Sequence, residues 1–174
     1  MIDLFNRYRT ALLFLIKFIS AYVVLNIAYG AFVELYNPRP DPVTVLVTAQ
    51  TSYVLNLFGA NTHTLESGER PNVLLCQPKG NSILSVYEGC NGLNVVIVFL
   101  SFLIAFRLNS KLIWFIPLGI FIIHLSNLVR IALLYHVGIN LPDYSYFAHK
   151  YLFTASIFLV VFGLWFWWLK KLID

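Results

Sequence analysis

The sequence predicts an all-α membrane protein with four transmembrane helices, one amphipathic interfacial helix and a small extracytoplasmic β-hairpin. Hydrophobic residues make up 59% of the 174 positions and charged residues only 11%, and the mean hydropathy is +0.76. Four long apolar runs alternate with polar segments along the chain. Because lipid offers backbone groups no hydrogen-bonding partners, the membrane part must be helix packed on helix, and a sheet can form only outside the bilayer. We expect one domain over residues 1–174.

The first apolar run, about residues 10–33, is long enough to cross a hydrocarbon core of about 30 Å. It follows Arg7 and Arg9, and Lys17 lies within it. The run is longer than the apolar core of a signal peptide, so we expect a retained anchor, although Ala28-Tyr29-Gly30 faintly resembles a cleavage site.

An extracytoplasmic segment is expected over about residues 37–89, because Pro38, Pro40 and Pro42 cannot continue a helix. From residue 43 to 58 two sets of side chains alternate at helical spacing, an apolar set and a polar set: Val43, Leu46, Val47, Tyr53, Val54, Leu57 and Phe58 against Thr44, Thr48, Thr51, Ser52 and Asn56. This spacing predicts an amphipathic helix that lies on the bilayer or caps the bundle, with a deeper, re-entrant placement as the alternative.

Two strand-like runs follow, at 72–77 and 82–87, and Pro78-Lys79-Gly80-Asn81 between them has the composition of a turn. They predict a β-hairpin that leads into Cys90.

Three further spans are expected at about residues 91–107, 112–137 and 146–169. A short basic loop, Arg107–Lys111, joins the first two of these. The last span ends in three tryptophans and two lysines, which is typical of an anchor at the membrane interface.

Basic residues cluster at the chain ends and in the 107–111 loop, which the positive-inside rule assigns to the cytoplasm. The sequence therefore predicts a multi-pass protein of the cell (inner) membrane with cytoplasmic N- and C-termini. The lipid bilayer is the expected partner, and no nucleic acid is expected because the basic residues lie at the ends of apolar runs. The two cysteines form no metal-binding spacing with histidine, so no metal and no cofactor are expected.

This orientation brings three reactive side chains to the extracytoplasmic side. Cys90 lies at the outer end of the second span, Arg130 about two turns below the outer end of the third, and His149 at the outer start of the fourth. A guanidinium in the centre of a membrane helix costs at least about 2.5 to 3.5 kcal/mol, so Arg130 needs compensation. Ser126 and Asn127 lie on the same helix face and can provide it. The alternative is a structural charge that snorkels or pairs with a carbonyl.

The pentapeptide Glu88-Gly89-Cys90-Asn91-Gly92 marks the change from polar to apolar sequence. Its glycines suit the close approach of a peptide backbone, and we expect a helix N-terminus together with Arg130 to lower the pKa of the Cys90 thiol. Glu88 would act in the opposite direction unless it faces the arginine or the histidine. Two alternatives remain for Cys90: a small buried hydrophobic residue, or a disulfide with Cys76.

His149 could also be an ordinary interfacial histidine, and His136 competes with it for the catalytic role. His124 lies deeper and suits helix packing, and His63 belongs to a loop.

The residues Glu88-Gly89-Cys90-Asn91-Gly92, Asn127-Leu128-Val129-Arg130 and His149 resemble the motifs of the exosortase and archaeosortase family, membrane-embedded cysteine transpeptidases that cut C-terminal sorting signals. The resemblance covers about residues 86–162. Many relatives are larger and often carry Ser or Thr where Asn91 stands. The compact length looks like the short exosortase branch of Bacteroidetes.

The resemblance implies that Cys90 is the nucleophile and that Arg130 and His149 support it, with Asn127, Glu88, Asn91 and Ser126 around them. The substrates would be exported proteins that end in a short motif, one transmembrane span and a basic tail. Two other classes remain open: a non-enzymatic membrane assembly or transport subunit, and a membrane cysteine acyltransferase acting on lipid.

Overall fold

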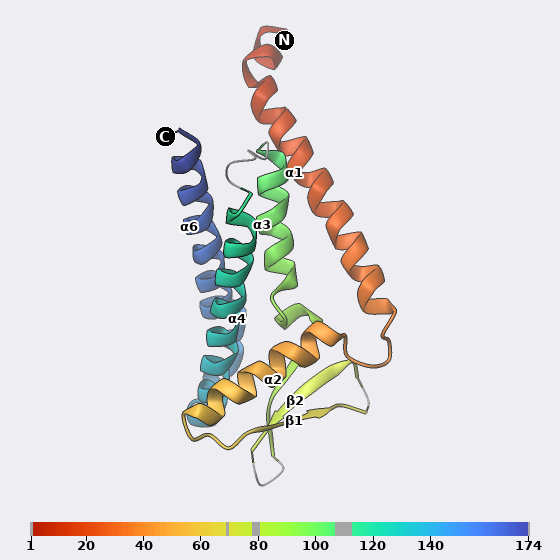
Figure 1. The fold of residues 1–174 in the computed structure, drawn as a ribbon, viewed down its shortest axis with the longest axis vertical. Helices are drawn as coiled ribbons and strands as arrows, with labels where there is room; N and C mark the ends of the chain where they lie inside the picture. Colours follow the sequence, from red (N-terminus) through yellow and green to blue (C-terminus); the bar gives the residue numbers. More distant parts are fainter. Residues whose placement is uncertain (1, 69, 78–80, 107–112, 174) are drawn as a thin grey trace.

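The fold is that of a computed structural model, which describes residues 2–68, 70–77, 81–106 and 113–173. Four helices run beside one another: α1 (Ile2–Glu34), α3 (Leu93–Ala105), α4 (Phe115–Asn140) and α6 (Phe153–Ile173). A fifth helix, α2 (Pro42–Leu57), and a small sheet gather at one end of these helices, and both chain termini lie at the other (Figure 1).

Among the described residues, three helical stretches are long and apolar enough to cross a membrane: Tyr8–Glu34, Phe115–Asn140 and Pro142–Lys171. This agrees with the predicted helical membrane protein. The predicted second span is represented by α3, which has only 13 residues and rises about 20 Å, less than the hydrocarbon thickness of about 30 Å. The predicted loop at 107–111 and the expected start of the third span at residue 112 lie outside the described residues.

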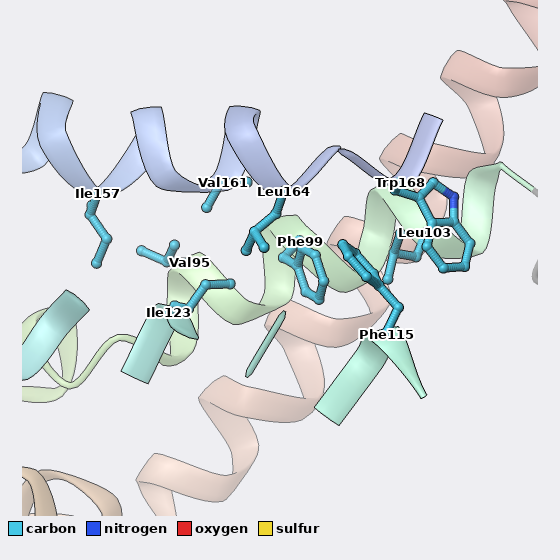
Figure 2. Close-up of a cluster of buried hydrophobic side chains, with 9 residues drawn as sticks. All are labelled: Val95, Phe99, Leu103, Phe115, Ile123, Ile157, Val161, Leu164 and Trp168. Atoms are coloured by element: carbon cyan, nitrogen blue, oxygen red, sulfur yellow. The ribbon is translucent and has the colours of Figure 1, made fainter. Parts of the chain in front are cut away.

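One buried cluster holds three of the helices together. It lies where α3, α4 and α6 meet, and its side chains point toward one another in Figure 2: Val95, Phe99, Leu103, Phe115, Ile123, Ile157, Val161, Leu164 and Trp168. The rings of Phe99 and Phe115 are 5.9 Å apart. The close approach of α3 to α4 depends on Gly119, because a Cβ there would collide with the Phe99 ring.

Helix α1 packs against α3, and the Phe14 ring lies 5.6 Å from the ring of Phe102 and 5.0 Å from that of Phe106. The remaining sides of α1 expose apolar residues such as Ile16 and Ile27, which suits a helix surrounded by lipid.

The last span is interrupted by irregular helical turns. Pro142–Tyr144 forms a 3-10 turn (η3), Ser145–Phe147 a single α turn (α5) and Ala148–Leu152 a π-helix (η4), before α6 continues to residue 173. The π-helix carries one of the predicted site residues, His149.

The polar segment forms a three-stranded antiparallel sheet instead of the predicted two-stranded hairpin. The strands β1 (His63–Glu66), β2 (Asn72–Cys76) and β3 (Ser82–Tyr87) pair in the order β1-β2-β3. Strand β1 is four residues long and mostly exposed, so it lacks the alternation of apolar and polar residues that indicates a half-buried strand. Most of the predicted turn at 78–81 lies outside the described residues.

Helix α2 is at the predicted position, but its polar side faces the protein. It buries Thr44, Thr48, Thr51 and Ser52 together with Val47 and Leu55, while Leu46, Tyr53, Leu57 and Phe58 stay exposed. The threonine hydroxyls can be buried because they donate to helix carbonyls one turn earlier, at 2.7 Å for Thr48 and 2.8 Å for Thr51. The apolar side of α2 therefore remains at the surface.

We predict that Gly119→Ala lowers the thermal unfolding midpoint of the purified protein, because the added methyl displaces the fully buried Phe99 ring. The cost expected for overpacking a core is about 1–3 kcal/mol. Gly163→Ala is the matched control, since a Cβ at that helical glycine meets nothing within 4 Å, and it should leave the midpoint unchanged or raise it. Equal midpoints for the two variants would contradict the close α3–α4 contact.

Candidate functional site

The backbone around Cys90 is fixed by the junction between sheet and membrane helix. Strand β3 ends at Tyr87, Glu88–Cys90 forms a 3-10 turn (η1), and α3 begins after Gly92, whose φ of +88° is left-handed. A Cβ at Gly92 would also lie 3.2 Å from the Asn127 side chain. That side chain donates from Nδ2 to the Cys90 carbonyl at 2.9 Å. Glycine is therefore needed at position 92 both for the turn and for the approach of α4.

His149 lies directly beside the cysteine. The Cys90 Sγ is 3.3 Å from the His149 Nε2. The histidine belongs to the π-helix η4, and Thr154 Oγ1 donates to its carbonyl at 2.9 Å. π-Helical turns often occur at functional sites because the extra residue redirects a side chain. His136, the competing candidate, is exposed on α4.

Arg130 is buried near the cysteine and shares a partner with it. The guanidinium, 8% exposed, donates from Nη1 to Asn127 Oδ1 at 3.3 Å. The Asn127 amide thus bonds both Arg130 and the Cys90 carbonyl. The Arg130 Nε is buried and has no hydrogen-bond partner among the described residues. Ser126, expected to help hold the charge, instead lines a neighbouring groove together with Arg130.

Asn91 ties the cysteine turn to two other helices. Its Nδ2 donates to Tyr29 Oη at 2.9 Å and to Thr44 Oγ1 at 3.2 Å, and its Oδ1 accepts from Leu93 N at 2.9 Å. Tyr29 in turn donates to the Glu88 carbonyl at 2.9 Å. Asn91 and the Glu88 backbone therefore position the turn, and no pattern in the sequence pointed to Tyr29.

A fourth side chain at the sulfur, Tyr87, was not expected from the sequence. Its ring lies over Gly89, where an added Cβ would be 2.5 Å from the Tyr87 Cε2. A hydrogen bond from the Tyr87 phenol is one of the influences that lower the pKa of the Cys90 thiol. The position of Tyr87 at the end of the strand-like run, three residues before the cysteine, is the one sequence signal that could have indicated it.

The expectation that the cysteine has a lowered pKa is wrong. Burial raises the pKa of the Cys90 thiol above its ordinary value and outweighs the opposing effects of the Arg130 charge and the Tyr87 hydrogen bonds, while the Glu88 carboxylate raises it further. The pKa of the Tyr87 phenol is raised too, chiefly by the charge of the Cys90 thiolate and then by burial. The resting thiol is therefore protonated at neutral pH.

Two hollows meet at Arg130. A cavity of about 450 Å³, the site cavity, is lined by Tyr87, Gly89, Arg130, His149 and Lys150 together with residues of α1, α3 and α6. A second hollow of about 560 Å³, the α4–α6 groove, is almost entirely apolar apart from Arg130, Ser126 and Ser156. His124 lines neither of them and instead lines a groove with residues of α2.

The alternative disulfide is not formed, because Cys76 and Cys90 are both buried free thiols. Cys76 ends β2, where it pairs with His63 and Ser82 of the adjacent strands. Within the part of the chain that the structure describes, no group of three His, Cys, Asp or Glu side chains could hold a metal ion.

Arg130 of α4 and His149 of η4 line one cavity, and the buried Cys90 of η1 lies directly behind it, with its sulfur against His149 and under the influence of the Arg130 charge. Asn127, Glu88 and Asn91 surround them, and Ser126 lies on the far side of Arg130. No family model, no curated protein and no solved structure matches the chain.

We predict that Arg130→Gln shifts the pH profile of Cys90 alkylation to higher pH, measured by mass spectrometry in a Cys76→Ala background. The Arg130 charge lowers the thiol pKa, so its loss leaves less thiolate at neutral pH and slows the reaction. Arg130→Lys, which keeps the charge, should shift the profile less. Lys150→Gln removes a charge elsewhere in the cavity and is the control. If the Arg130→Gln profile has the same pH midpoint as the parent profile, or a lower one, the electrostatic coupling between Arg130 and Cys90 is contradicted.

Proposed function

We propose that the protein is a membrane-embedded cysteine peptidase or transpeptidase that cleaves the C-terminal sorting signal of exported proteins, as the exosortase and archaeosortase family does. The observation that carries this proposal is the 3.3 Å distance between Cys90 Sγ and His149 Nε2, side chains 59 residues apart in sequence. A nucleophile and a base within such reach are the usual signature of covalent catalysis. The resemblance of three separate motifs to that family supports the same assignment.

The protonated thiol determines how the reaction would begin. His149 Nε2 takes the thiol proton as the sulfur attacks a substrate carbonyl, whose π electrons move to the oxygen. The buried Arg130 Nε, which has no partner among the described residues, is a donor for that oxyanion. When the intermediate collapses, the C–N bond breaks, the leaving amine takes the proton from His149, and a thioester remains on Cys90. An acceptor amine or water then releases the product.

The arrangement of the helices supports a site on the extracytoplasmic side of the cytoplasmic membrane. Both termini, the end of α3 and the start of α4 lie at one end of the bundle, and α2 and the sheet lie at the other (Figure 1). With the basic residues of that first end in the cytoplasm, the sheet and Cys90 face outward. In this topology α3 is the second of four crossings, although its 13 residues are fewer than a full span of the hydrocarbon core requires.

The α4–α6 groove supports a substrate with an apolar span. It is open, almost entirely apolar, and reaches Arg130 at the edge of the site. A substrate helix in this groove would bring the motif that precedes its outer end to Cys90, while the basic tail that follows the helix stays on the cytoplasmic side.

The same groove favours a second candidate, a cysteine acyltransferase that takes a lipid acyl chain. A volume of about 560 Å³ could hold such a chain next to Arg130. Both candidates form a thioester on Cys90, and they differ in what the thioester carries.

We predict that Cys90→Ala abolishes cleavage of a coexpressed protein ending in a short motif, an apolar span and a basic tail, whereas Cys76→Ala leaves cleavage intact. Both substitutions remove one buried free thiol, so the pair separates chemistry from packing. Protein level and cleavage are measured by immunoblot. Continued cleavage by a normally produced Cys90→Ala protein would reject the proposal and favour a non-enzymatic subunit. Mass spectrometry of the acyl group on Cys90, released with hydroxylamine, distinguishes a peptide from a fatty acid.

A further inference from the structure

We propose that Tyr87 is a further catalytic residue, whose phenol O–H stabilises the attacking sulfur and then the oxyanion. This inference rests on the proposed function above. It concerns a side chain that lies outside the three motifs on which the family resemblance is based.

The local backbone fixes Tyr87 next to the turn that carries Cys90. Tyr87 is the last residue of β3, paired with Asn72 of β2, and is also the N-cap of the 3-10 turn η1. Tyr87 keeps the extended backbone of the strand, and Cys90 ends the turn three residues later. The sheet therefore anchors the tyrosine backbone at the start of the turn that carries the thiol.

Gly89 makes this arrangement possible. A Cβ at Gly89 would lie 2.5 Å from Cε2 and 3.2 Å from Cδ2 of the Tyr87 ring. Any larger residue would push the ring away from the turn. The glycine in the cysteine pentapeptide thus has a role besides access for substrate: it lets the phenol reach Cys90.

The environment of Tyr87 is that of a site residue and not of a core tyrosine. Tyr87 is 43% exposed and lines the site cavity with Arg130 and His149, whereas Tyr135 on α4 is 1% exposed. The charged and titratable groups around the thiol are Glu88 from η1, Arg130 from α4, and His149 and Lys150 from η4, and two further phenols line the same cavity, Tyr22 of α1 and Tyr146 of α5. Of the three phenols, Tyr87 is the one whose hydrogen bond influences the Cys90 thiol.

The chemistry follows from two successive negative charges. As His149 removes the thiol proton, the sulfur gains charge and accepts a hydrogen bond from the phenol O–H. Once the S–C bond forms, the charge moves to the carbonyl oxygen, to which the phenol O–H can donate next. The phenol keeps its proton throughout and acts only as a hydrogen-bond donor. A raised pKa of the phenol suits a donor that stays protonated.

The test is the pH profile of Cys90 alkylation by iodoacetamide, with the purified full chain in nanodiscs and a Cys76→Ala background. We expect Tyr87→Phe to slow alkylation at neutral pH by roughly three- to tenfold, the worth of one hydrogen bond to the thiolate. The limiting rate at high pH should be unchanged, because the ring still packs on Gly89. Tyr144→Phe, an exposed tyrosine outside the site cavity, is the control and should match the parent.

Gly89→Ala is a second, independent variant, expected to slow alkylation in the same direction by displacing the ring. Adding Tyr87→Phe to it should have little further effect, because both act on one hydrogen bond. A parent-like profile for Tyr87→Phe would overturn the inference, and so would a lowered limiting rate alone, which indicates altered access.

The catalytic part of the inference is tested with the coexpressed substrate. Tyr87→Phe should lower the cleavage rate at saturating substrate more than it raises the KM. A shifted alkylation profile with undiminished cleavage would reject the catalytic role. Alkylation requires no peptidase activity, so failure of the proposed function would show separately, as cleavage that survives Cys90→Ala.

Discussion

The candidate site depends on one side chain, the buried amide of Asn127. Its Nδ2 donates a hydrogen bond to the Cys90 carbonyl, and its Oδ1 accepts one from the Arg130 guanidinium. A buried guanidinium is costly unless it is hydrogen-bonded, and the amide offsets part of this cost while fixing the cysteine turn against α4. The contact exists only because Gly92 leaves room for it. The position of the charge and the position of the thiol are thus set by one interaction.

A second set of polar contacts secures the same turn from the opposite side. Asp41 caps α2 by accepting from the backbone of Val43 and Thr44, each at 3.0 Å, and also contacts the Thr44 hydroxyl. That hydroxyl accepts from Asn91. The start of α2 is therefore linked to the cysteine turn, which explains why α2 turns its threonines inward. Its apolar residues Leu46, Tyr53, Leu57 and Phe58 are left on the exposed side of the helix.

Features that depend on composition and on the order of segments along the chain could be predicted from the sequence. Features that depend on how each element is rotated and packed against its neighbours could not. Apolar runs indicated the helices, and charge bias placed Cys90, Arg130 and His149 at one level. The length of α3, the strand β1 and the inward face of α2 could not be predicted, because tertiary contacts decide them. The prediction of a lowered thiol pKa was wrong because the sequence shows which charges lie nearby but does not show burial, which has the larger effect on this pKa. Tyr29 and Thr154 gave no signal, since their roles arise only when α1 and the π-helix are in place.

The place of Asn127 along α4 determines how deep in the bundle the cysteine turn lies. Asn127 follows the first residue of α4, Phe115, by 12 positions, so the Cys90 carbonyl that it binds lies about 18 Å along a helix that is about 40 Å long. The cysteine turn therefore lies near the middle of α4 and not at its far end, where Gly138 meets Ile83 of β3. A peptide bond can be attacked at that depth only where its helix has unwound, since helical carbonyls are shielded by their own hydrogen bonds. For the peptidase proposed above, a helix-breaking residue at the cleaved bond would then matter as much as any side chain that is recognised.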